Sequence, residues 1–118
     1  MTDFYGNIEK LTLKNKNYRK VLATTKNMQL VLMSLKPLEE IGTEVHKHTS
    51  QFMRIEKGSC VAIIGSKKIK LKDDDFIIIP PNTKHNIINN SKTEKLKLYS
   101  IYTPPEHKPG LIQKRKDD

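Results

Sequence analysis

The chain has 118 residues, 36% of them hydrophobic, which is enough for one domain around a single core. Its 22 basic and 13 acidic residues give a formal net charge of +9, a balance that nucleic-acid-binding proteins share. The lysines are scattered, however, and aromatic residues make up only 6% of the chain, so the sequence argues against a nucleic-acid partner.

Short apolar or alternating runs, each ended by a turn, recur along the chain. Alternation predicts β-strands, and the turns contain the Gly, Pro, Asn and Asp residues that reverse a chain. The predicted strands cover residues 10–13, 18–24, 28–35, 51–56, 59–64, 67–71, 76–79, 85–89 and 95–102. With no convincing helix, we expect an all-β antiparallel fold with under about a tenth helix, far below the usual share. The segment 104–118, rich in Pro, Gly and Lys, is predicted to be a mobile tail with a solvated His107.

Candidate metal ligands gather in the stretch before and after a short turn at 49–50. His46 and His48 are two apart, so on an extended strand both imidazoles would point to one side, and Glu44 has the same parity. Gln51 would return opposite them on the next strand. Neutral imidazoles and an oxygen donor from adjacent strands suit a divalent first-row transition metal.

His85 supplies a further ligand from another part of the chain. It opens the predicted strand 85–89 directly after a Pro-Pro-Asn turn at 80–82, so we expect it to meet the other histidines at the mouth of one pocket. The predicted metal ligands are therefore His46, His48, Gln51 and His85. Glu44 has two open roles, either as a ligand in place of His48 or as a catalytic base.

Two stretches together resemble the paired motifs of the cupin family. The first motif is His-x-His, then an acid and a glycine, matched here by His46, His48, Gln51 and Gly58. The second is matched by Asp74-Asp75, Pro80-Pro81-Asn82, His85 and Asn89. Gln51 thus stands where the family has an acid, and Asp74 and Asn82 stand where it has glycines. Asn tolerates the left-handed backbone that glycine would adopt at position 82, so the turn is expected to survive.

The resemblance covers residues 42–89 and implies a single domain, 1–118, folded as an antiparallel double-sheet jelly-roll barrel. It also implies one divalent metal (Zn, Mn, Fe or Ni) and a small-molecule ligand. Phosphomannose isomerases are cupins that also use a glutamine as a metal ligand, so the similarity favours an isomerase acting on a sugar or sugar phosphate. An iron-dependent dioxygenase and a non-catalytic, metal-stabilised sensor are the alternatives.

The remaining expectations concern compartment and assembly. No apolar run is long enough for a membrane span and no signal-peptide pattern opens the chain, so no membrane association is expected. A single cysteine, Cys60, fits a reducing cytoplasm. Exposed edge strands need covering, and the long apolar strand 28–35 together with the N-terminal segment suggests a homodimer.

Overall fold

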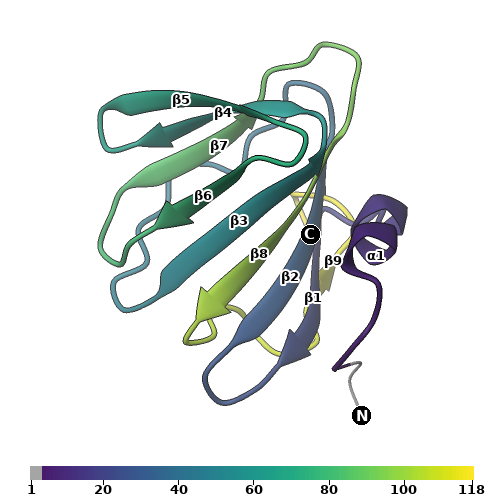
Figure 1. Ribbon diagram of the computed structural model, residues 1–118, viewed down its shortest axis with the longest axis vertical. Coiled ribbons are helices and arrows are strands. Elements are labelled where there is room, and N and C mark those ends of the chain that lie inside the picture. The colour runs from purple at the N-terminus through teal and green to yellow at the C-terminus, as the bar shows by residue number, and fades with distance from the viewer. Residues whose placement is uncertain (1–3) are drawn as a thin grey trace.

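Two antiparallel sheets face each other across one hydrophobic core in the computed structural model, which describes residues 4–118 (Figure 1). The larger sheet has the strand order β6-β3-β8-β2-β1-β9 and the smaller one the order β5-β4-β7. The strands are β1 (Arg19–Thr24), β2 (Gln29–Leu35), β3 (Ser50–Lys57), β4 (Ser59–Ile64), β5 (Lys67–Lys72), β6 (Phe76–Ile79), β7 (His85–Asn89), β8 (Leu96–Thr103) and β9 (Ile112–Gln113). Among residues 4–118, no helix is long and apolar enough to cross a membrane.

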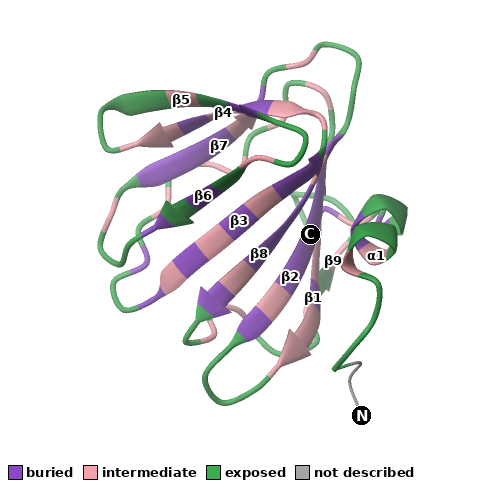
Figure 2. Ribbon diagram, in the orientation of Figure 1, coloured by how far each residue is buried: buried purple, intermediate pink, exposed green. Residues whose placement is uncertain are grey.

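The all-β prediction is confirmed, and β1 to β8 begin and end within one residue of the strands expected from the sequence. Alternation explains this accuracy. Along β3, Gln51, Met53 and Ile55 are buried while Phe52 and Arg54 are only partly covered, and Figure 2 shows this banding along the strand. In a strand with one buried face, every second residue of the sequence is apolar, which is why such strands can be predicted.

The predicted strand at 10–13 is wrong, because these residues belong to a helix, α1 (Ile8–Lys14). Asn7 caps the helix, and its side-chain oxygen accepts a hydrogen bond from the backbone N–H of Lys10 at 2.9 Å. Ile8 and Leu11 are three apart, so they share the helix face that packs on the outside of the larger sheet near β3 and β8. Leu11 and Leu13 alternate as apolar residues do in a strand, but Leu13 is exposed on the helix.

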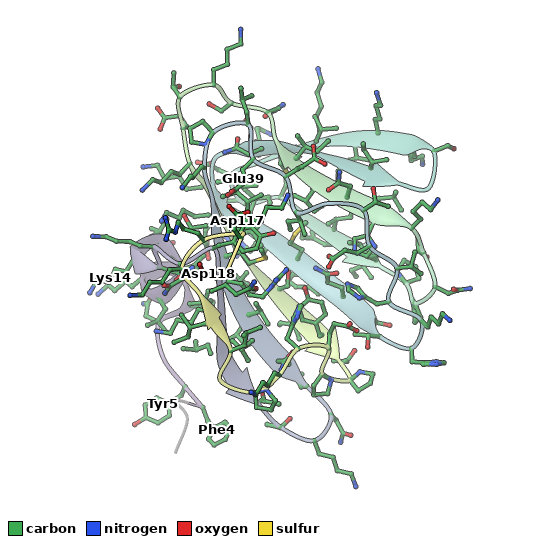
Figure 3. All side chains as sticks on the ribbon, turned by 180° about the vertical axis from the view of Figure 1, so that it is seen from behind. Phe4, Tyr5, Lys14, Glu39, Asp117 and Asp118 are labelled. Atoms are coloured by element: carbon green, nitrogen blue, oxygen red, sulfur yellow. The ribbon has the colours of Figure 1, made fainter. Side chains whose placement is uncertain are left out.

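The C-terminal segment is not the free tail that the sequence predicts. Its strand β9 pairs with β1, and the side chain of the fully buried Gln29 is hydrogen-bonded to the backbone of Glu106 and His107. The Lys116 Nζ donates to the carbonyl oxygen of Glu40 at 2.7 Å, and Figure 3 shows the chain end beside Glu39. Because Gln29 of β2 holds this segment, no pattern within residues 104–118 could predict its position.

Cys60 gives a prediction that follows from the core alone. It is fully buried on β4, and burial raises the pKa of its thiol to about 12. Because the thiolate is the nucleophile, we expect a thiol reagent at about pH 8 to leave the folded protein unmodified. The same reagent should modify the single cysteine promptly in denaturant, which an absorbance assay with and without guanidinium will measure. Fast modification of the folded protein would contradict this burial.

Candidate metal centre

The site begins with a short antiparallel bridge between Glu44 and the first residue of β7. The backbone N–H of Glu44 donates to the carbonyl of His85 at 2.8 Å, and the N–H of His85 donates back at 3.0 Å. Residues paired in this way project their side chains to the same face of the sheet. Glu44 and His85 therefore enter the same space although they are far apart in the sequence.

His46 is brought to the same place by the turn that precedes β7. Its carbonyl accepts a hydrogen bond from the backbone N–H of Asn82 at 2.7 Å. Its ring lies 5.1 Å from the ring of His85, and its other neighbour is the buried ring of Tyr102, at 5.7 Å in an edge-on arrangement. The ring of His46 is thus clamped between aromatic partners and is only 7% exposed.

The turn before β7 confirms the expectation about position 82. Asn82 has φ 60° there, and Asp74 has φ 72° in the turn between β5 and β6, so both adopt the left-handed conformation in which a glycine is usual. Asn and Asp are the non-glycine residues that adopt it most readily. The turn therefore keeps its shape without glycine and delivers the N–H of Asn82 to His46.

Glu44, His46 and His85 bring their ligand atoms together. One side-chain atom of each lies within 4.8 Å of those of the other two, close enough to hold one ion. We call these three residues the candidate triad. Both histidines are buried, while the Glu44 side chain is 32% exposed and reaches toward solvent.

The histidine nitrogens show how well the triad fits a metal. In His85, Nδ1 lies 2.9 Å from the carbonyl oxygen of Thr83, which can only accept, so Nδ1 carries the proton and Nε2 has a free lone pair. Both Nε2 of His85 and Nε2 of His46 are buried without a hydrogen-bond partner. Buried polar atoms are rarely left unpaired unless something else binds them. Two unpaired lone pairs beside a carboxylate form a donor set that suits a divalent transition metal.

Gln51 lies on the same interior face, on β3. It is paired with Tyr102 on the neighbouring strand β8, and the ring of Tyr102 contacts His46. Gln51 is 3% exposed. Its amide nitrogen donates to the hydroxyl of Ser100 at 3.1 Å, while its amide oxygen is buried and has no partner. The amide oxygen is therefore the atom free to serve as a fourth donor.

The structure does not bring His48 to the triad. The chain bends at Lys47 and His48 instead of continuing as a strand, so the parity that places Glu44 and His46 together does not extend to His48, which is exposed. Of the two alternatives left open by the sequence, the arrangement favours Glu44 over His48 beside the histidine pair.

One residue at the site was missed by the sequence reasoning. The Oε2 atom of Glu106 lies 3.3 Å from Nδ1 of His46, on the side of the ring away from the triad. Glu106 follows two prolines in the segment predicted to be mobile, and no motif marks it. Glu44 is therefore not the only acid near the histidines.

Two further side chains close this end of the barrel, and their protonation follows from burial. Burial raises the pKa of the Tyr102 hydroxyl, and the nearby charge of Glu44 adds to the effect. The ring of His107 packs edge-on against Tyr102 at 5.1 Å, so His107 is not the solvated residue that we expected. Burial, with the charge of Arg19, lowers the pKa of His107 to about 4, which keeps it neutral at physiological pH.

Comparisons with known proteins identify the family and the fold. The family model described as "Cupin domain" matches residues 31–102. The protein L612 of Acanthamoeba polyphaga mimivirus is 48% identical over 93% of this chain and 71% of its own length. YrkC of Bacillus subtilis is 42% identical over 98% of this chain, which spans 64% of YrkC. The solved structure of BH2720 from Bacillus halodurans superposes with a TM-score of 0.94 at 38% identity, covering 99% of this chain and 96% of that one.

Proposed function

The chain belongs to the cupin family, and we propose that it is a metal-dependent enzyme acting on a small polar molecule. The observation that carries the proposal is the pair of buried, unpartnered Nε2 atoms of His46 and His85 beside the carboxylate of Glu44. In the proposed centre these three residues bind one divalent ion, and the amide oxygen of Gln51 is the fourth donor. A bound ion of this kind polarises a carbonyl or hydroxyl oxygen of a substrate.

The reaction class that we favour is isomerisation of a sugar or sugar phosphate. Such a reaction needs a group that moves a proton next to the polarised carbonyl. In this reaction Glu44 would leave the ion and act as the base, because it is the partly exposed member of the triad and its carboxylate is the one that an incoming substrate can reach; the two histidines and Gln51 would keep the ion. The glutamine in the donor set supports this choice, because phosphomannose isomerases, which are also cupins, use one. An amide oxygen is neutral, so the net charge of the centre is more positive by one than with a carboxylate in the same place. This favours the binding of anionic and polyhydroxyl ligands.

A second candidate has its own observation. Two histidines and one carboxylate with open positions are the donor set of non-haem iron oxygenases. If Glu44 remains a ligand and Gln51 does not bind, the triad has this composition. The second candidate is therefore an iron enzyme that uses molecular oxygen on a small substrate.

Metal analysis of the purified protein separates these candidates. The protein is purified without added metal, its metal content is determined, and it is assayed against small sugar phosphates and for oxygen uptake. We expect one divalent metal per chain and interconversion of a sugar phosphate that is lost in Glu44→Gln. Oxygen uptake with bound iron would favour the second candidate. Stoichiometric metal with neither activity would leave a metal-stabilised binding domain.

We also propose that the protein is a homodimer. The long strand 28–35 lies inside the sheet as β2, paired with β1 and β8, so it is not the exposed edge that the sequence suggested. The larger sheet instead ends at β6, where Phe76 and Ile78 are each 59% exposed and Phe76 stacks on Phe52 at 5.8 Å. An apolar edge strand of this kind is the surface that a second copy would cover.

Sedimentation velocity at micromolar concentration tests the dimer. We expect the parent protein to sediment as a dimer and the variant Phe76→Lys to sediment as a monomer, because the charge would be buried in the interface. Lys68→Ala, on the exposed face of β5, is the control and should remain dimeric. A parent that sediments as a monomer at all concentrations would rule the dimer out.

A further inference from the structure

The contact between Glu106 and His46 joins the C-terminal segment to the candidate triad. Glu106 Oε2 lies 3.3 Å from His46 Nδ1, and the Glu106 side chain is 32% exposed while that of His46 is 6% exposed. The contact does not have the geometry of a hydrogen bond, but Glu106 is the nearer of the two carboxylates that face the ring, and its negative charge favours the neutral tautomer with the proton on Nδ1. This leaves Nε2 of His46 as the unprotonated nitrogen, and Nε2 is the atom that faces Glu44, at 3.8 Å.

Gln29 fixes the backbone that carries Glu106. Its amide oxygen accepts from the backbone N–H groups of Glu106, at 3.1 Å, and His107, at 2.9 Å. Its amide nitrogen donates to the carbonyl of His107 at 2.7 Å and to the hydroxyl of Thr24 at 3.0 Å. Gln29 is fully buried, and its amide makes the four hydrogen bonds that it can make, three of them to the backbone of Glu106 and His107.

The two histidines of the triad are therefore oriented by different means. His85 is held by a backbone carbonyl, that of Thr83, which a substitution of side chains does not remove. His46 depends on a side chain, which comes from a distant part of the chain. Carboxylates placed behind metal-binding histidines fix the tautomer and raise the basicity of the ligating nitrogen.

We propose that Glu106, anchored through Gln29, is a positioning residue that holds His46 in the tautomer required for binding metal through Nε2. The inference rests on the proposed metal centre and deepens it. Glu106 acts on the ion only through His46. The C-terminal segment thereby becomes part of the site, although it lies outside both cupin motifs and beyond residues 31–102 matched by the family model.

A partly exposed ion pair that adds only a little stability is the competing explanation. It predicts that loss of Glu106 changes the thermal stability of the metal-free protein slightly and leaves both the tautomer of His46 and the metal affinity unchanged. The two explanations therefore differ in readouts other than folding.

The test compares Glu106→Ala, Glu106→Gln and the control Glu94→Gln, which alters an exposed glutamate away from the triad. Zinc affinity is measured by competition with a chromophoric chelator at fixed pH. We expect Glu106→Ala to weaken zinc binding by roughly 10- to 100-fold, as for other residues behind metal-binding histidines. Glu106→Gln should lose less, because its neutral amide oxygen can still face Nδ1–H, and Glu94→Gln should bind as the parent does.

Long-range proton–nitrogen NMR of the metal-free proteins gives the second readout. The parent should show His46 protonated at Nδ1 only, whereas Glu106→Ala should show a mixture of tautomers. Parent-like zinc affinity or a parent-like tautomer in Glu106→Ala would overturn the inference while leaving the centre intact, provided that His46→Ala no longer binds zinc. Failure of the parent to bind zinc would overturn the proposed centre and this inference together.

Discussion

Replacing Asn89 by alanine is expected to lower the free energy of unfolding by about 2–4 kcal/mol, because it leaves several buried backbone groups unpaired. The Asn89 side chain is fully buried at the end of β7. Its amide nitrogen donates to the carbonyls of Lys36 and Glu94, each at 2.9 Å, and lies 3.4 Å from that of Leu35. Its amide oxygen accepts from the backbone N–H of Ser91 at 3.0 Å. One residue thus ties β7 to the end of β2 and to the turn before β8.

Asn90 provides a matched control next to Asn89 in the chain. Its side chain is exposed and accepts a single hydrogen bond, from the hydroxyl of Ser59 at 2.8 Å. Asn90→Ala should therefore change the free energy of unfolding by no more than about 0.5 kcal/mol. Urea denaturation of both variants measures the difference. Equal small effects would show that Asn89 does not hold these segments together.

Replacing His46 or His85 by alanine is expected to abolish stabilisation by metal. In the parent, an ion that binds only the folded state should stabilise it by about 2.7 kcal/mol when free metal is a hundred times its dissociation constant. Each of these histidines supplies one unpartnered Nε2 atom of the triad, so either variant should lose this shift in thermal denaturation. Gln51→Ala should weaken it less, because an amide oxygen is the poorest donor of the set. The shift should also shrink as pH falls, since protons compete with the ion for imidazole.

His48→Ala is the matched control for these variants. His48 lies two residues from His46, yet it is exposed and outside the triad, so its removal should leave the metal-dependent shift unchanged. A parent-like shift in both His46→Ala and His85→Ala would place the ion elsewhere. Loss of the shift in His48→Ala would mean that the bend at residues 47–48 straightens when the ion binds.

The contrast between His46 and His48 shows how far the sequence could predict the site. Short apolar or alternating runs predicted eight of the strands. The two motifs predicted His46, Gln51 and His85, which are all buried at one end of the barrel. The period of two holds only while the chain remains extended, and it ends at the bend after His46. His48 therefore shares a motif with His46 and not its environment.

Contacts between distant segments account for what the sequence could not predict. Gln29 and His107 are separated by 78 positions, and neither belongs to a motif that would pair them. Gln29 also holds the backbone N–H of Glu106. The helix α1 was likewise predicted as a strand, because its buried face is defined by the sheet beneath it. The alternation of Leu11 with Leu13 is a local pattern that does not reveal this face.

A crystal structure of the zinc-loaded protein, with the ion located by anomalous scattering, tests the central claim most directly. We predict one ion per chain, at about 2.0–2.1 Å from Nε2 of both His46 and His85 and at about 2.0–2.2 Å from a carboxylate oxygen of Glu44. The amide oxygen of Gln51 should face the same ion. An ion bound through His48, or one that contacts neither His46 nor His85, would contradict the proposed centre.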